Sequence, residues 1–290
     1  MSAEVNQRAE FAARAFKAAC LAELEALKPG NVHIFADGHG MVIQDFIHSA
    51  EAATQVIAQP ESSVGERILH SIEATQAAVG HNTNLGIVLL CAPMIHAVLH
   101  VDRGNLRRDI GSVLDALTVA DAVLAYRAIL LASPAGLRES PRHDVRTEPQ
   151  ITLLEAMREA GERDLIAQQY ANGFADVFEI GVMRYQETLR RWERPAWSAT
   201  AVYLSFLAEF PDSHIVRKYG SAAALRVREQ AAVTLRLMLE ADNPKLFMRD
   251  LLKFDGELKS QGLNPGTSAD LTVATLLAVS LQNADAKGPE

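Results

Sequence analysis

Apolar residues recur along this 290-residue chain at the three- and four-residue spacing of helices that bury one face. The stretch over residues 85–99 is apolar nearly all round, which predicts a central buried helix. Thr118 begins another helix with a pattern like a capping box, in which Asp121 replaces the usual Glu. The spacing also predicts helices over residues 4–27, 43–58, 64–79, 198–210 (capped by Ser198), 222–241 and 244–259, two helices within 150–191, and a last helix from about 268.

The segments between these helices lack the patterns of β-structure. No sustained alternating run, hairpin dipeptide or repeat of fixed period occurs. The longest segment without helical periodicity, residues 133–149, contains three prolines and many charges. We therefore predict an all-α fold, a single-domain multi-helix bundle of about nine to twelve helices over residues 1–283, followed by a frayed tail at 284–290.

Composition supports a helical globular protein and argues against several functional classes. Apolar residues make up 49% of the chain and aromatic residues 6%, which favours helices over sheets. A formal charge of −8 argues against nonspecific nucleic-acid binding, because no excess of cations exists to displace counterions. Cys20 and Cys91 lie in apolar helical stretches, which is typical of buried small side chains. Without a secretory signal or an apolar run of membrane-spanning length, we expect a cytoplasmic protein outside the membrane, compatible with a homodimer.

Four short polar segments, at residues 28–33, 81–84, 211–218 and 264–270, interrupt the helical pattern. A connection between helices needs only a few residues with turn chemistry. These segments instead gather amide, imidazole, hydroxyl, carboxylate and cationic groups next to Gly and Pro. Such loops are typical of polar-ligand sites. We therefore predict that the polar loops between the helices meet and form the functional site.

Two of these segments have side chains that could either bind a ligand or serve a helix end. Pro265 and Gly266 predict a tight turn directly before a helix, whose free N–H groups and dipole favour an anion. Thr267 and Ser268 either cap that helix or donate hydroxyl groups to a phosphate. Lys28 either binds a phosphate or satisfies carbonyl groups at the end of its own helix. The sequence leaves these alternatives open.

The other polar groups suit a nucleotide triphosphate, although surface ion pairs would also account for several of them. One residue of 82–84 is expected to cap the following helix, and the remaining amides could contact a base or a ribose. Segments 141–146 and 211–218 combine carboxylate, imidazole and guanidinium groups, which suit phosphates and Mg²⁺. No P-loop, GxGxxG, HExxH or GxSxG motif occurs, so we expect a helical nucleotide site of another kind.

Taken in this order, the segments resemble the triphosphoribosyl-dephospho-CoA synthase family, which makes the prosthetic-group precursor of citrate lyase and malonate decarboxylase. The strongest points of the resemblance are Lys28-Pro29-Gly30-Asn31-Val32, Asn82-Thr83-Asn84-Leu85-Gly86 and Asn264-Pro265-Gly266-Thr267-Ser268-Ala269-Asp270-Leu271. The resemblance implies an all-α transferase that uses Mg²⁺ and two small phosphorylated substrates, ATP and 3′-dephospho-CoA. A ribose hydroxyl of the acceptor would displace adenine from C1 of the ATP ribose, and the triphosphate would stay attached.

Such glycosyl transfer needs an anion near C1, a base for the attacking hydroxyl, and cations on the triphosphate. Asp144 and Asp270 are predicted to face Mg²⁺ or the cationic C1, and His33 or His143 to transfer the proton. The predicted phosphate- and nucleotide-binding residues are Lys28, Gly30, Asn31, Asn82, Thr83, Asn84, Arg146, Asp212, Ser213, His214, Arg217, Lys218, Asn264, Gly266, Thr267 and Ser268.

The sequence departs from the citrate-lyase enzymes in two places. They carry Arg-Gly-Glu where this chain has residues 143–146, and their pattern differs near 211–220. In these places the chain is more similar to a subgroup found with methanopterin-linked one-carbon metabolism. Two alternatives therefore stand beside the main hypothesis. One is a same-fold nucleotide-dependent transferase acting on another acceptor in methanopterin- or methanofuran-type cofactor biosynthesis, and the other is a noncatalytic nucleotide-binding helical protein.

Overall fold

A computed structural model describes residues 3–101, 104–134 and 143–285. Within these residues no β-structure extends beyond two isolated bridges, and the predicted all-α fold is confirmed. The α-helices are α1 (Ala3–Glu25), α2 (Ile43–Ile57), α3 (Val64–Val79), α4 (Leu85–His100), α5 (Leu106–Asp115), α6 (Val119–Ala132), α7 (Leu153–Ala160), α8 (Leu165–Asn172), α9 (Met183–Trp192), α10 (Pro195–Glu209), α11 (Ser213–Tyr219), α12 (Ser221–Glu240), α13 (Met248–Ser260) and α14 (Gly266–Asp285). A π-helical turn, η1 (Val177–Val182), precedes α9, and a 3₁₀ turn, η2 (Pro244–Phe247), precedes α13.

The ends of several helices follow local features of the sequence. The Ser63 hydroxyl accepts the N–H of Glu66, whose carboxylate accepts the N–H of Ser63, so α3 begins with a capping box. Gly80 ends the same helix in the left-handed conformation, at φ 77°. Thr118 and Asp121 form the same reciprocal pair at the start of α6, with Asp in the position usually held by Glu. The capping pattern predicted there is confirmed.

Other helix boundaries differ from the sequence prediction. The described residues form fourteen α-helices, because the short helices α5 and α11 are not apparent from periodicity and residues 150–191 divide into α7, α8, η1 and α9. The prediction that Ser198 caps a helix is wrong. Helix α10 begins at Pro195, and Ser198 is buried within it, with its hydroxyl donating to the carbonyl of Arg194 at 3.2 Å. Proline suits this first helical position, where its missing N–H would have no partner.

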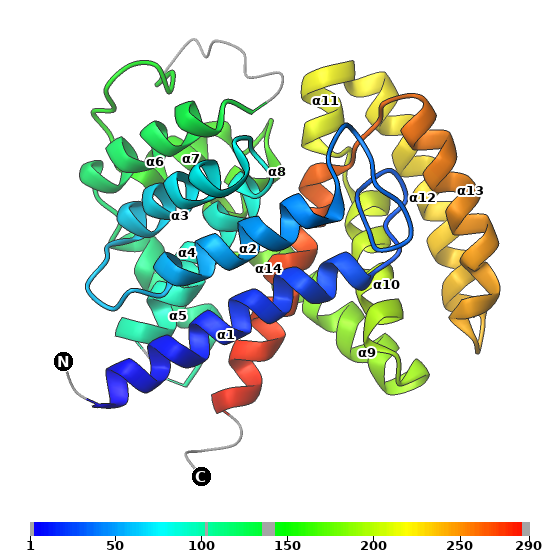
Figure 1. Cartoon of the computed structure of the whole chain (residues 1–290), viewed down its shortest axis with the longest axis horizontal. Coiled ribbons are helices and arrows are strands. Elements are labelled where there is room, and N and C mark those ends of the chain that lie inside the picture. Colours follow the sequence, from blue (N-terminus) through cyan, green and yellow to red (C-terminus); the bar gives the residue numbers. More distant parts are fainter. Residues whose placement is uncertain (1–2, 102–103, 135–142, 286–290) are drawn as a thin grey trace.

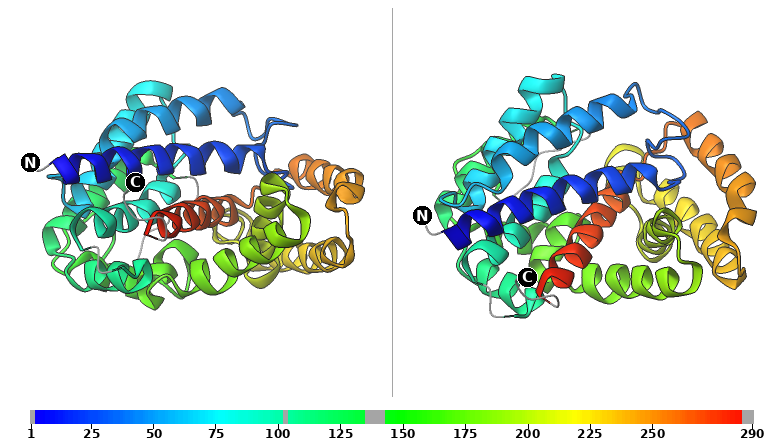
Figure 2. Two further views of the ribbon diagram at one scale, coloured as in Figure 1. Left: turned by 90° about the horizontal axis from the view of Figure 1, so that it is seen from below. Right: turned by 60° about the horizontal axis from the view of Figure 1, so that its bottom comes forward.

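The helices form two sides joined by long central elements. Figure 1 shows α3–α7 on one side of the molecule and α11–α13 on the other, with α14 (red) running through the middle behind α1. The two turned views in Figure 2 show the same division. Helix α10 contributes to the hydrophobic clusters of both sides: Val202 and Phe206 pack in one, and Tyr203 and Leu204 in the other. The sides are therefore parts of one packed structure.

Three further predictions, on the cysteines, membrane spans and the C-terminal tail, can be compared with the structure. Cys20 and Cys91 are free and buried, as predicted for small core side chains. No helix among the described residues is long and apolar enough to cross a membrane. Helix α14 extends to Asp285, so it includes the first two residues of the predicted tail, and residues 286–290 lie outside the described part of the chain.

Candidate active site

All four polar segments contribute to the wall of one cavity of about 560 Å³. The wall is built from the end of α1, the loop before α2, the starts of α4, α8 and α14, the end of α6, and α11. The polar residues of the wall are Glu23, Asn31, His39, Gln76, His81, Asn82, Thr83, Asn84, Ser133, Asp164, His214, Arg217, Lys218, Asn264, Thr267 and Asp270. The fold therefore brings segments distant in sequence to one place.

Three helices of this wall begin at the cavity: α4, α8 and α14. Gly86, Ile166 and Thr267 lie in their first turns and line the wall. The helix dipole and unpaired N–H groups favour an anion at such a start. At α8 the N–H groups of the first turn already donate to Ser213 and Asp164, so the starts of α4 and α14 supply the free donors. At the start of α4, the Asn84 side chain makes no capping bond; its Nδ2 donates to Thr75 at 2.9 Å, and its Oδ1 is buried without a partner. This wall thus offers both N–H donors and one free amide acceptor.

The turn before α14 gives its two hydroxyl groups different surroundings. Asn264 Oδ1 accepts the amide of Asn31 at 2.8 Å, which ties this turn to the loop after α1. The N–H and hydroxyl of Ser268 both donate to Asp212 at 2.8 Å, and Ser268 is not part of the cavity wall. Thr267 lines the cavity. Ser268 therefore serves the helix start, and Thr267 is the one of the two residues that lines the cavity.

Asp212 is a buried brace between two helices of the wall. Its Oδ1 accepts two N–H groups at the start of α11, at 2.9 and 3.3 Å, while its Oδ2 accepts both bonds from Ser268. Burial raises the pKa of this carboxyl, and the hydrogen bonds oppose that rise. Ser213 links a third helix, because its hydroxyl accepts the N–H of Leu165 at 2.9 Å. Asp212 and Ser213 thus support the wall without lining it.

Removing the Asp212 brace should affect stability strongly. We expect Asp212→Ala to lower the free energy of unfolding by about 3 kcal/mol, since helix-start N–H groups of α11 and α14 lose their acceptor. Denaturant titration measures this change. Asp250→Ala, at an exposed position of α13, is the control and should change stability by no more than about 0.5 kcal/mol. Equal effects of the two substitutions would contradict the bracing role.

The basic side of the cavity comes from α11. Arg217 pairs with Asp164 at 2.8 Å, whereas Lys218 is exposed and has no carboxylate partner among the described residues. Burial, followed by the charges of Arg217 and Lys218, lowers the pKa of His214 to about 4. The imidazole is therefore neutral near pH 7. Arg217 and Lys218 supply the positive charge of this side, next to the helix starts.

Asp270 brings into the cavity a carboxylate that has no hydrogen bond or ion pair to any described residue. Burial raises its pKa well above the ordinary range, and the charges of Glu23 and other nearby carboxylates add to the rise, with Arg217 opposing it. The carboxylate packs against Gly86, where a Cβ atom would overlap with it. A half-buried, unpaired carboxylate among like charges is a candidate for contact with a cation or a cationic transition state.

Lys28, predicted to bind phosphate, is only 1% exposed and is not part of the cavity wall. Its ammonium forms an ion pair with Glu23 and donates to the amide oxygen of Asn31 at 3.1 Å. Burial lowers the pKa of Lys28, and the charge of Glu23 opposes that change. From this side, the residues that line the cavity are Glu23 and Asn31.

His33 and Gly30 also lie behind the wall, against α13. Asp255 of α13 accepts the N–H of Gly30 at 2.9 Å and lies 3.4 Å from His33 Nε2. Burial lowers the pKa of His33. Gly30 has φ 84°, and a Cβ there would meet Pro265 at 2.8 Å, so only glycine fits this turn without strain. Both residues hold the loop that places Asn31 in the wall.

The structure does not bring His143, Asp144 and Arg146 to the cavity wall. Asp144 pairs with Arg146 at 3.2 Å, and His143 Nε2 lies 3.5 Å from Glu159. Asp144 and Asp270 thus do not meet as the predicted pair of Mg²⁺ ligands. In the described part of the chain, no group of three His, Cys, Asp or Glu residues could hold a metal ion. Local ion pairs account for the polar character of this segment.

Several residues of the wall are not selected by reasoning from polar loops, among them Glu23, Gly86 and Asp164. Glu23 lies within α1, where a charged residue ordinarily indicates a solvated face. Asp164 accepts the N–H of Ile166 at 2.9 Å and is explained as a helix cap. Gly86 is the one with a usable sequence feature, because a glycine in the first turn of an apolar helix indicates close approach of another group.

Comparisons with known proteins identify the family of the chain and a solved structure with a similar fold. The family model CitG, ATP:dephospho-CoA triphosphoribosyl transferase, matches residues 9–288. A crystal structure from Archaeoglobus fulgidus, described as a "putative triphosphoribosyl-dephospho-coA synthase", shares the fold with a TM-score of 0.62 and 22% sequence identity, over 80% of this chain and 97% of that chain. A search of curated proteins finds no significant match. Because the family model spans nearly the whole sequence, the chain belongs to the CitG family of ATP:dephospho-CoA triphosphoribosyl transferases.

Proposed function

We propose that this protein transfers the triphosphoribosyl group of ATP to a ribose hydroxyl of 3′-dephospho-CoA and releases adenine. Family membership supports the reaction, and the convergence of all four polar segments on one cavity is the observation that carries it. The cavity volume of about 560 Å³ lies within the range of about 300–1,000 Å³ typical of ligand sites. Helix starts and cations suit a triphosphate, and an unpaired carboxylate suits a developing cation.

The triphosphate would lie against the basic side and the helix starts. Arg217 and Lys218 would neutralise phosphate oxygens, and Thr267 with free N–H groups at the starts of α4 and α14 would donate hydrogen bonds. The buried Oδ1 of Asn84 would accept a bond from an amino or hydroxyl group of the nucleotide. Asn82 would add a further amide from the same turn.

Positive charge develops on the ATP ribose as the bond from C1 to adenine breaks and the bond to the acceptor oxygen forms. Asp270 would stabilise that charge, because its carboxylate lines the cavity and has no partner among the described residues. Mg²⁺ also fits this wall, since the ion binds through one or two carboxylates together with phosphate oxygens. Asp270 is the free carboxylate that would hold it, and the ion would neutralise phosphate charge.

Adenine release tests the proposal directly. The purified protein is incubated with ATP, MgCl₂ and dephospho-CoA, and free adenine is separated by chromatography. We expect adenine in amounts equal to the acceptor consumed, and none when dephospho-CoA is omitted. A folded protein that binds ATP but releases no adenine under these conditions would contradict the proposal. Release only with a phosphorylated precursor of a one-carbon cofactor would favour the alternative acceptor.

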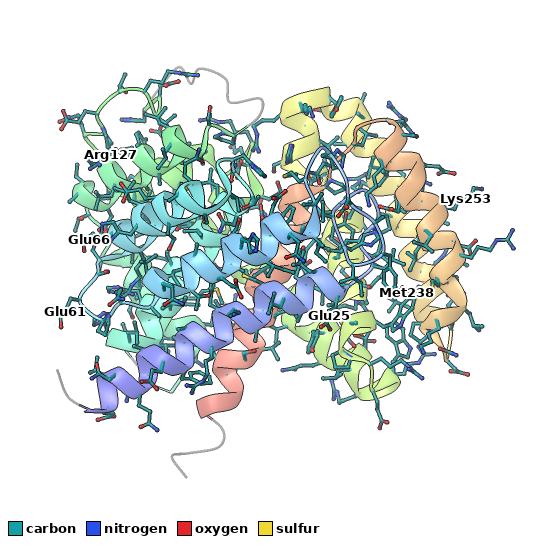
Figure 3. All side chains as sticks on the ribbon, in the orientation of Figure 1. Glu25, Glu61, Glu66, Arg127, Met238 and Lys253 are labelled. Carbon is teal, nitrogen blue, oxygen red and sulfur yellow. The ribbon has the colours of Figure 1, made fainter. Side chains whose placement is uncertain are left out.

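Lys218 offers a test of the phosphate-binding side. We expect Lys218→Ala to raise KM for ATP by about tenfold, equivalent to about 1.4 kcal/mol, with little change in kcat, because an exposed cation contributes equally to binding and transition state. The effect should shrink as salt is increased. Lys253→Ala is the control, since Lys253 is an exposed lysine of α13, labelled at the edge of the molecule in Figure 3. An equal effect of both substitutions would count against the assignment.

A further inference from the structure

Glu23 has an almost fully buried carboxylate that lines the proposed substrate cavity. It lies in the last turn of α1 and is 4% exposed. It lines both the large cavity and a second recess of about 10 Å³ that shares part of the same wall. The sequence-based prediction considered the polar loops and therefore assigned no ligand-binding or catalytic role to Glu23, which belongs to a regular helix. A carboxylate held in this way needs a physical reason to be ionised.

Lys28 provides that reason. Its ammonium forms an ion pair with Glu23, is 1% exposed, and does not line the cavity, so its charge acts on Glu23 and not directly on a ligand. The second bond from Lys28 goes to Asn31, which in turn donates to Asn264 at 2.8 Å. Lys28 therefore holds the carboxylate from behind and connects it to the turn before α14.

The turn that carries Lys28 is itself fixed against α10. The N–H of Leu27 donates to the hydroxyl of Thr200 at 3.0 Å, and the hydroxyl of Tyr203 donates to the carbonyl of Pro29 at 2.6 Å. These buried bonds flank Lys28 on both sides in sequence. Because α10 packs in both hydrophobic clusters, the position of the Glu23–Lys28 pair is set by the most central part of the fold.

The charged groups around Glu23 favour a role as a general base over a purely structural role for its carboxylate. Burial raises the pKa of Glu23, and the charge and hydrogen bond of Lys28 oppose part of that rise. Asp270, Cys20 and Tyr203 are the other titratable groups that feel its charge. The three carboxylates of the cavity therefore differ: Glu23 has a buried cation beside it, Asp164 pairs with Arg217, and Asp270 has no partner among the described residues. Such separation of environments is typical of carboxylates with separate catalytic roles.

We propose that Glu23 is the general base that removes the proton from the attacking hydroxyl of the acceptor, and that Lys28 is its positioning residue. The proposal rests on the transferase function above. The hydroxyl proton passes to the Glu23 carboxylate as the acceptor oxygen bonds to C1 of the ribose. The C1–nitrogen bond breaks, its electron pair leaves with adenine, and adenine takes up one proton from solvent. His214 is the less suitable base, since its pKa is lowered to about 4.

The test compares kcat and its pH dependence in variants of the full chain. We expect Glu23→Gln to lower kcat for adenine release by about 10³-fold, with KM for ATP changed by no more than about twofold. The decline of kcat at acid pH, caused by protonation of Glu23, should disappear in this variant. We expect Lys28→Met to move that decline to higher pH, because the positive charge that lowers the pKa of Glu23 is gone. A purely structural role would not shift the profile.

Matched controls separate this effect from general damage. Glu25→Gln changes an exposed carboxylate on the same helix, labelled at its C-terminal end in Figure 3. Lys253→Met removes an exposed lysine of α13 that lies 3.9 Å from Glu257, outside the cavity wall. Both should leave the pH profile of kcat unchanged. Glu23→Gln alone leaves the buried ammonium of Lys28 without its carboxylate partner, which could impair folding. The double variant Glu23→Gln/Lys28→Met removes both charges and so tests the loss of the base without that unpaired charge.

The outcomes distinguish the two proposals. If the wild-type protein releases no adenine, the transferase function fails before the role of Glu23 is tested. If the wild type is active and the folded Glu23→Gln or double variant keeps more than about a tenth of kcat with the wild-type pH profile, Glu23 is not the base. A loss of about 10³-fold in both folded variants, with the profile shifted in Lys28→Met, would support the assignment.

Discussion

Replacing Asp270 with asparagine is expected to lower kcat for adenine release by about 10³-fold and, at the same time, to raise the melting temperature by about 3 °C. The loss follows because the carboxylate that faces the developing positive charge is removed from the cavity wall. The gain follows because loss of solvation, and then the negative charges of nearby carboxylates, raise the pKa of Asp270 and oppose its ionisation in the folded protein. Stability and activity should therefore change in opposite directions.

The pH dependence of the stability gain provides a second measurement. A carboxyl whose pKa is raised by folding costs stability above its ordinary pKa, because the native state resists ionisation. The advantage of Asp270→Asn should therefore be present at pH 7 and should shrink as the pH falls toward about 4. Asp250→Asn, at an exposed position of α13, should alter neither activity nor stability. A lower melting temperature for Asp270→Asn would show that the carboxylate has a stabilising structural role instead.

Magnesium titration separates the two cationic contacts available to Asp270. If the carboxylate mainly holds Mg²⁺, raising the MgCl₂ concentration should restore part of the activity of Asp270→Asn. If it mainly faces the ribose, activity should stay low at every concentration. Of the two contacts proposed for Asp270, stabilisation of the ribose cation is the one that should limit kcat, so we expect no recovery. Restoration to within about tenfold of the wild type would assign Asp270 to the metal.

A single methyl group at position 86 is expected to inactivate the enzyme. The Cβ of alanine at Gly86 would overlap with the Cγ and Oδ2 atoms of Asp270, so the carboxylate must leave its place in the wall. We expect Gly86→Ala to lower kcat by about 10²-fold or more, because small displacements of a catalytic group have large effects. The same change would ordinarily stabilise a helix by about 1 kcal/mol, so loss of activity cannot be ascribed to helix propensity.

Gly111 offers a matched control. It lies within α5, where a Cβ atom would meet nothing within 4 Å, and α5 forms no part of the cavity wall. Gly111→Ala should keep full activity and a melting temperature at or above that of the wild type. Combining Gly86→Ala with Asp270→Asn should cost little more than Asp270→Asn alone, because both act on one carboxylate. Additive losses in the double variant would show that Gly86 acts through another group.

Local features of the sequence predict much of this fold, and tertiary packing accounts for the differences. Helices α2 and α3 follow from apolar periodicity, and the caps Ser63 and Gly80 also mark the two ends of α3. Helix α11 does not, because its seven residues are mostly polar and its start is fixed by Asp212 through contacts with α14. A bond between helix starts 56 residues apart leaves no periodic trace in the sequence.

The site is predictable where a loop side chain faces the ligand and much less so where a helix supplies it. Asn31, Asn82, Lys218 and Thr267 stand beside Gly, Pro or polar neighbours in the predicted loops, and the structure gathers them in one wall. Glu23 has no such neighbours, so only the meeting of α1 with α4 and α14 shows that it faces the cavity. Conversely, the polar segment around Asp144 satisfies its charges locally.

The wall of the cavity draws on positions from Glu23 to Asp270, which has a consequence for biosynthesis on the ribosome. A nascent chain that has emerged only as far as α11 carries the cations of the site, but neither Asp270 nor the start of α14. ATP therefore cannot act as a template for the early helices, which must hold together through their own apolar contacts until the last helix leaves the exit tunnel. Ligand-linked stabilisation becomes available only at that final step.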